Sequence, residues 1–383
     1  MEKRQILVFM DWFLPGYKAG GPIRSVANLV RALSEDFDFY IVTRNTDLSD
    51  DKPYREIEPN KWHLKYSAHV YYLSADNYSK DKIKTLIGER NYDAMYLNSL
   101  YSSQYALTPL LIRNKHFPDL KTVLAPRGML GAGALQNKSL KKAIFLKTTK
   151  IFQFFKGITW HAASEDEKIT ISKKFGSNAK IIVGAPISIP AKFDATNKIN
   201  KYPGAARFFF IGRVSEHKNI SFALDCFIKL KPKGEILFDI FGAAEEQQYL
   251  KKIETQIKQL PSNIKVNYKG SMPNEELKTK LQAEYHFMLF PTKGESFSHS
   301  IVDSWNSGCP VLISDQTPWL DLEYNSIGWN FNLTDPMSLM NAINQAVHLN
   351  QETYNNWSDS CVHFYHKIVC SEEITNKNML IFE

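Results

Sequence analysis

Short apolar segments alternate with amphipathic segments of helical period along most of the chain, and this alternation occurs twice. Parallel strands need a long connection, usually a helix, so the pattern predicts two α/β domains with parallel, doubly wound sheets. The chain has 383 residues, which is more than one compact hydrophobic core normally serves. The strands expected in the first series are 6–10, 39–43, 70–73, 94–97, 122–125, 158–162 and 180–184, with helices at 23–33 and 82–89.

The second series begins after a polar, turn-rich stretch at 185–206, where we expect a domain boundary. The expected domains are 1–190 and 205–350, followed by a helical segment at 351–383. Ligands of doubly wound sheets bind at the carboxyl ends of the strands, which predicts a cleft between the two domains. The second series comprises strands at 208–211, 236–241, 265–268, 287–290 and 311–313, and helices at 220–230, 245–259, 274–283 and 299–306.

The overall charge of the chain predicts an anionic partner. The formal net charge is +7 and the pI is near 8.9, which suits nucleotide sugars, acidic lipid surfaces or nucleic acid. No segment approaches the roughly 18 uncharged apolar residues that span a bilayer. The apolar run at 6–10 is too short for a signal peptide, and the four cysteines form no paired motif. These features predict a cytoplasmic protein with reduced thiols and no metal site.

The most informative stretch is 293–311, where a loop of small residues precedes an apolar helix. Glu295 lies in the loop and Asp303 lies about two helical turns further on. Backbone N–H groups at a helix start can bind an anion or a sugar hydroxyl, and Asp303 could hold ribose hydroxyls. A capping glutamate and a surface aspartate would be the structural alternative. The loop residues whose amides could take part are Ser296, Phe297 and Ser298.

A second loop combines Gly212, Arg213 and Lys218 between an expected strand and an expected helix. A guanidinium and an ammonium five residues apart can bind two phosphates, although both could also be solvated loop cations. Gly20 and Gly21 follow the first strand, where glycines allow a ligand to approach the backbone. The glycine patterns of dinucleotide and P-loop sites are absent, which argues against NAD and ATP.

Two positions at strand ends in the first half could contact an acceptor. Arg127 and Gly128 open a glycine-containing loop after the strand at 122–125, and His161 ends the strand at 158–162. A surface arginine and a core histidine are the structural alternatives.

The segment 137–157 carries lysines interleaved with apolar residues and no acid. It predicts a basic amphipathic helix at an anionic membrane surface, or else a core-facing helix with a solvated basic face. Nucleic acid is not expected, because no recognised reader motif accompanies the charge. The lysines proposed to face the membrane are Lys138, Lys141, Lys142, Lys147 and Lys150.

Together these motifs resemble the retaining glycosyltransferases of family 4, which have the GT-B architecture of two Rossmann-like domains. The resemblance covers nearly the whole chain. The stretch from Ala125 to Leu130, with the lysine-rich segment after it, is similar to the branch that builds bacterial surface polysaccharides such as O-antigen, capsule or exopolysaccharide. The matching positions are Gly20, Gly21, Gly212, Arg213, Lys218, Asn219, Gly242, Glu295, Asp303, Gly308 and Pro310.

The resemblance implies a nucleotide-diphospho-sugar donor, with UDP or GDP, and a glycan or lipid-linked glycan acceptor. No metal or other cofactor would be required, because Arg213 and Lys218 would stabilise the leaving diphosphate. Glu295 would contact donor-sugar hydroxyls, and Asp303 would hold the ribose. The glycines would let the phosphates approach, and the first domain would bind the acceptor. A C-terminal helix, with 354–367 as the candidate, would cross back to the first domain.

The chain departs from the family pattern at two positions. The motif usually ends in Glu where this chain has Asp303, and many members carry His where this chain has Arg127. The Asp303 substitution gives slight support to a non-catalytic nucleotide- or glycan-binding relative. A nucleotide-sugar epimerase of the same architecture is the alternative enzyme.

Overall fold

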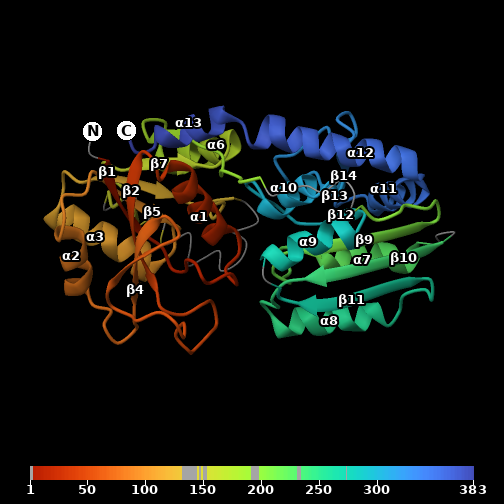
Figure 1. The fold of residues 1–383 in the computed structure, drawn as a ribbon, viewed down its shortest axis with the longest axis horizontal. Helices are drawn as coiled ribbons and strands as arrows, with labels where there is room; N and C mark the ends of the chain where they lie inside the picture. Colours follow the sequence, from red (N-terminus) through yellow and green to blue (C-terminus); the bar gives the residue numbers. More distant parts are fainter. Residues whose placement is uncertain are drawn as a thin grey trace. The chain divides into compact units, whose positions relative to one another are not determined.

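The computed structural model describes residues 3–131, 145, 148–149, 153–190, 198–230, 234–272 and 274–383. The chain forms two compact units (Figure 1). The first unit comprises Met1–Ile189 and Glu372–Glu383, and the second comprises Pro190–Ser371. The chain thus returns to the first unit after it has completed the second.

The first unit is built on an eight-stranded sheet in the order β3-β4-β2-β1-β5-β6-β7-β8. Its strands pair in parallel, except that the edge strand β3 is antiparallel to β4. The strand order reverses between β1 and β5, which makes their carboxyl ends the expected ligand position of this sheet. The strands are β1 (Arg4–Phe9), β2 (Phe37–Arg44), β3 (Trp62–Lys65), β4 (Ala68–Leu73), β5 (Ala94–Asn98), β6 (Lys121–Ala125), β7 (Thr159–Ala162) and β8 (Lys180–Val183).

Helices cover both faces of this sheet and form one hydrophobic core on each face. Helix α1 shows why: its apolar residues recur at helical spacing, and Ile23, Val26 and Leu33 are buried. The final residues join the same core, where Phe382 contacts the rings of Phe37 and Phe39. The helices are α1 (Gly21–Leu33), α2 (Lys80–Gly88), the π-helix η1 (Ser103–Leu107), α3 (Thr108–His116), α6 (Glu165–Phe175) and α13 (Glu372–Met379).

The second unit contains a six-stranded parallel sheet in the order β11-β10-β9-β12-β13-β14. Its order reverses between β9 and β12, so the loops that follow these two strands flank the expected ligand position. The strands are β9 (Ala205–Ile211), β10 (Glu235–Phe241), β11 (Ile264–Gly270), β12 (Phe287–Phe290), β13 (Val311–Ser314) and β14 (Gly328–Phe331). The helices are α7 (Ile220–Lys229), α8 (Gln247–Ile257), α9 (Asn274–Glu284), α10 (His299–Asn306), α11 (Pro336–His348), α12 (Gln351–Phe364) and the π-helix η3 (Tyr365–Val369).

The two doubly wound sheets confirm the fold predicted from the sequence. The strand prediction omitted β3 and β14, which have four residues each. Helix α12 packs within the second unit, where Trp357 stacks on Trp329 at 4.3 Å between ring centres. The segment that packs on the first unit is Glu372–Glu383.

Three sequence predictions concern membrane-spanning helices, metal sites and the lysine-rich segment. In the described ranges, no helix has both the length and the apolar character needed to cross a bilayer. The same ranges contain no group of three or more His, Cys, Asp or Glu side chains arranged to hold a metal ion. The lysines proposed to face a membrane, Lys138, Lys141, Lys142, Lys147 and Lys150, lie outside the described residues.

Candidate functional site

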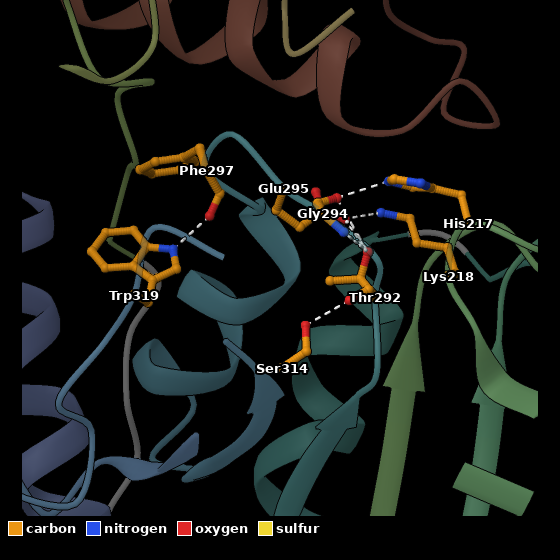
Figure 2. Close-up of polar contacts among 8 residues, drawn as sticks. All are labelled: His217, Lys218, Thr292, Gly294, Glu295, Phe297, Ser314 and Trp319. Carbon is orange, nitrogen blue, oxygen red and sulfur yellow. Dashed lines mark hydrogen bonds and ion pairs between the residues drawn. The ribbon is translucent and has the colours of Figure 1, made fainter. Parts of the chain in front are cut away.

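Two loops of the second unit meet at the carboxyl edge of its sheet, one after β9 and the other after β12 (Figure 2). The Lys293 N–H donates to the His217 carbonyl at 2.9 Å. The His217 Nε2 atom lies 2.8 Å from the Gly294 carbonyl oxygen. The ammonium of Lys218 forms an ion pair with Oε1 of Glu295. Lys218 and Glu295 are far apart in sequence and are nevertheless in direct contact.

The Lys218–Glu295 pair is largely shielded from solvent, since the side chains are 15% and 14% exposed. The Thr292 hydroxyl donates to the same oxygen of Glu295 at 3.1 Å. The Lys218 ammonium also lies 4.9 Å from the centre of the Phe290 ring, a favourable cation–π distance. Each charge is thus held in place by the other, and an anionic ligand of Lys218 would compete with Glu295.

Side chains from neighbouring segments fix the loop that carries Glu295 (Figure 2). The Ser314 hydroxyl donates to the Thr292 carbonyl at 2.5 Å, and the Trp319 indole N–H donates to the Phe297 carbonyl at 2.5 Å. The Glu295 N–H donates to the Gln316 carbonyl at 3.1 Å. These contacts hold the loop in one conformation at the start of α10.

The start of α10 presents backbone donors beside Glu295. The N–H groups of Ser296, Phe297 and Ser298 donate no hydrogen bond to any residue in the described ranges. Ser298 has a positive φ of 70°, which is uncommon for a residue with a side chain and typical of functional loops. Three such amides at a helix N-terminus suit an anion or a sugar hydroxyl. Asp303 lies half-buried in the middle of the same helix.

Gly212 and Gly242 permit a close approach of the loops after β9 and β10. The φ angle of Gly242 is 142°, and a Cβ atom there would lie 1.8 Å from the Gly212 carbonyl oxygen. Only glycine fits such a distance. The loops are joined further by the Val214 N–H, which donates to the Ala243 carbonyl at 2.8 Å.

Arg213 extends from the same loop into solvent. Its Nη1 donates to Oε1 of Glu245 at 2.8 Å, and the two side chains are 48% and 43% exposed. Exposed ion pairs of this kind stabilise a protein by about 0–1 kcal/mol, so a phosphate can displace Glu245 at little cost.

His217 was not predicted as a site residue, but it lies among the charged groups of the site. Burial lowers its pKa, the Gly294 carbonyl and Glu295 oppose this shift, and Lys218 and Arg213 lower the pKa further. The histidine is therefore neutral near pH 7 and can donate its Nε2–H to the Gly294 carbonyl. No sequence pattern selects His217, because its partner is the backbone oxygen of Gly294 in a distant loop.

In the first unit, Gly20 and Gly21 lie at the start of α1. Gly20 has a φ of 69°, and a Cβ atom there would meet no atom within 4 Å, so its backbone conformation and not space explains the glycine. Gly21 is the first residue of the helix. Among the described residues, no side chain caps the start of this helix.

A buried hydrogen-bond chain connects the residues predicted to contact an acceptor. Arg127 donates from Nε to Oδ1 of Asn98 at 2.8 Å and from Nη2 to the Tyr96 hydroxyl at 2.7 Å. The Tyr96 hydroxyl lies 2.8 Å from Nδ1 of His161, and Nε2 of His161 lies 2.7 Å from the Gly184 carbonyl oxygen. Because Nε2 must donate to a carbonyl, Nδ1 accepts the Tyr96 proton.

His161 and Arg127 differ in their exposure to solvent. His161 is 2% exposed, and burial lowers its pKa to about 3, so the ring is neutral. It serves the interior of the first unit, whereas Arg127 is half-buried and reaches the surface. The Gly128 N–H donates to Oε1 of Glu167 at 2.6 Å, which fixes the loop that begins at Arg127.

Comparisons with known proteins match part of the chain to a family and the whole chain to a fold. Residues 192–360 match the family model of glycosyl transferases group 1. No curated protein sequence matches the chain significantly.

Solved structures resemble the whole chain at low sequence identity. The Anabaena protein Alr3699/HepE, solved with UDP and glucose, is 14% identical with a TM-score of 0.72, and the match covers 99% of this chain and 98% of that one. Sucrose-phosphate synthase from Thermosynechococcus elongatus is 14% identical with a TM-score of 0.73 and the same coverage. WaaG, a glycosyltransferase involved in lipopolysaccharide biosynthesis, is 11% identical with a TM-score of 0.59, covering 98% of this chain and 99% of WaaG. The chain therefore has the GT-B fold, and its second half carries the sequence pattern of group 1 glycosyl transferases.

Proposed function

We propose that this protein transfers a sugar from a nucleotide-diphospho-sugar donor to a glycan or lipid-linked glycan acceptor, with retention of anomeric configuration. The contact that carries the proposal is the Lys218–Glu295 pair beside the unbonded amides of α10. A cation for the diphosphate and a carboxylate for sugar hydroxyls then lie side by side at the reversal point of the sheet. The match of residues 192–360 to group 1 glycosyl transferases supports this assignment.

In this proposal, Arg213 and Lys218 stabilise the negative charge that develops on the leaving diphosphate. Fixed positive groups can replace a metal ion in this role. Glu295, released from Lys218 by the phosphate, accepts hydrogen bonds from donor-sugar hydroxyls. Asp303 holds the ribose of the donor.

The transfer step balances without a basic side chain. The bond between the anomeric carbon and the diphosphate oxygen breaks, and the electron pair leaves with the diphosphate. The acceptor hydroxyl attacks the same face and gives its proton to a diphosphate oxygen. The anomeric configuration is thereby retained.

A role in bacterial surface polysaccharide synthesis is supported by the resemblance of the 125–130 loop and by the fold shared with WaaG. We place the reaction in the cytoplasm, with the lysine-rich segment at the inner face of the membrane. Vesicle co-sedimentation tests the latter point: replacement of Lys141, Lys142 and Lys147 by Glu should release the protein from anionic vesicles.

The function is tested by incubating the purified protein with a panel of UDP- and GDP-sugars and glycan acceptors. Nucleotide release and product anomers are followed by NMR. Acceptor-dependent product of retained configuration is expected, and Glu295→Gln should lower turnover by about 10²–10³-fold. Product formed without any acceptor would favour an epimerase, and wild-type turnover in Glu295→Gln would refute the site.

A further inference from the structure

A second cluster of polar and aromatic side chains lies at the carboxyl edge of the first sheet. Asp11 and Trp12 follow β1, Arg44 ends β2, and Gln104 lies in η1 after β5. The strand order of this sheet reverses between β1 and β5, so the cluster occupies the position where doubly wound sheets bind ligands.

Arg44 lies at the centre of the cluster. Its Nη2 donates to Oε1 of Gln104 at 2.6 Å and, at the longer distance of 3.4 Å, to Oδ1 of Asp11. Its guanidinium carbon lies 5.7 Å from the centre of the Trp12 ring and 5.2 Å from that of Tyr105. Within the described residues, only Nη2 of this guanidinium donates side-chain hydrogen bonds, and the group lies over both aromatic rings.

Several groups of the cluster lack partners within the protein. Arg44 Nε is buried and has no hydrogen-bond partner in the described part of the chain. Within the same part, neither the second carboxylate oxygen of Asp11 nor the indole N–H of Trp12 makes a hydrogen bond. Because Nε is shielded from solvent while the Arg44 side chain as a whole is 33% exposed, a ligand would accept from the other guanidinium nitrogens.

The segment that carries Gln104 has an unusual backbone. Residues Ser103–Leu107 form a π-helix, a geometry that is rare and occurs often at functional sites. The Ser102 hydroxyl accepts from the Tyr105 N–H at 3.0 Å, and the Tyr78 hydroxyl donates to the Gln104 carbonyl at 3.1 Å. Gln104 is therefore positioned firmly toward Arg44.

We propose that Asp11, Trp12, Arg44 and Gln104 form a carbohydrate-binding subsite for an uncharged pyranose ring with neighbouring hydroxyls. The carboxylate and the amide oxygen accept from hydroxyls, the guanidinium donates to them, and the indole contacts the apolar face of the ring. Asp11 offsets the charge of Arg44, so the pair favours a neutral sugar over an acidic one. Only the identification of this sugar as the acceptor rests on the proposed transferase function.

Binding is tested by saturation-transfer NMR with methyl glycosides of glucose, galactose, mannose, rhamnose and N-acetylglucosamine, and with methyl glucuronide as the acidic comparison, each with and without UDP. We expect wild-type protein to bind at least one of them. Trp12→Ala and Arg44→Gln should weaken that binding by about tenfold or more, and Trp12→Phe should retain most of it. Arg90→Gln is the matched control, because Arg90 also lies over a tyrosine ring, that of Tyr40 at 4.8 Å.

The inference fails if no methyl glycoside binds, if methyl glucuronide alone binds, or if Trp12→Ala and Arg44→Gln bind as wild type does. Far-UV circular dichroism and thermal melting confirm that each variant is folded, and UDP affinity should be the same in all of them. Failure of the proposed function would look different: glycosides would bind, but no nucleotide sugar would be turned over.

Discussion

Replacement of Lys218 by methionine tests the central contact of the second unit. Methionine has a side chain of similar length that can still contact the Phe290 ring, but it lacks the positive charge of the Lys218 ammonium. A charge-assisted hydrogen bond to a diphosphate oxygen contributes about 1.5–3 kcal/mol, which corresponds to a loss of about 10–150-fold in affinity. In this protein the bond from Lys218 to the diphosphate replaces an existing ion pair with Glu295. We therefore expect Lys218→Met to lower the nucleotide affinity by about tenfold, the lower end of this range.

Glu295→Gln should act on binding in the opposite direction. It removes the competitor of the phosphate, so UDP or GDP should bind as tightly as in wild type or more tightly. Turnover should nevertheless fall by about 10²–10³-fold in both variants, because each loses a group that stabilises the transition state. Glu295→Gln should therefore lower turnover without lowering nucleotide affinity, whereas Lys218→Met should lower both.

Isothermal titration calorimetry with UDP and with GDP measures the affinities, and nucleotide release measures turnover. Lys293→Met is the control, since Lys293 lies on the same loop and, among the described residues, its ammonium pairs only with exposed Glu216, at 3.9 Å. The reasoning is refuted if Lys218→Met binds both nucleotides as wild type does. It is also refuted if Glu295→Gln weakens binding as much as Lys218→Met, because the pair would then only shape the loop.

Three further results are expected. Gly242→Ala should destabilise the second unit by more than about 3 kcal/mol in thermal unfolding, because its Cβ would lie 1.8 Å from a carbonyl oxygen. Gly270→Ala, whose Cβ would meet no atom of the described residues within 4 Å, should cost about 1–2 kcal/mol, and equal losses would contradict this. Arg213→Gln should lower turnover about 10²-fold, and Lys293→Gln should not; similar activities would exclude Arg213 from the site. The folded protein keeps His161 neutral, with a pKa lowered to about 3, whereas the unfolded chain binds a proton at this residue below a pH of about 6.5. The free energy of unfolding therefore decreases as the pH falls from about 6.5 to about 3. At pH 5 the loss from this group is about 2 kcal/mol, and a His161→Gln variant with an unchanged pH profile of stability would contradict it.

The sequence predicted the elements of the fold where apolar runs were long and bounded by turn residues. That the loops after 208–211 and 287–290 serve one site followed from the family resemblance, because the sequence alone did not indicate that these two strands are neighbours in the sheet. Helix α6 was omitted although Ser164 and Glu167 have the spacing of a capping box, and the Glu167 N–H does donate to the Ser164 hydroxyl at 3.2 Å.

The partners of the site residues could not be predicted in the same way. Lys218 bonds to Glu295 and Arg213 to Glu245, and both choices depend on side-chain rotamers and on distances between loops. The inward orientation of His161 depends on Tyr96, a residue of another strand. Sequence patterns specify which edge of a sheet carries a residue, but the contacts along that edge follow from packing.

The return of the chain to the first unit affects the order in which the protein can fold during synthesis. Phe382 packs against Phe37 and Phe39, yet the ribosome makes it only after the whole second unit. Domains generally fold from the N-terminus as they emerge, but the first unit can complete this aromatic cluster only after Phe382 has been made. All residues of the second unit are synthesised before that point, so its own core can form first.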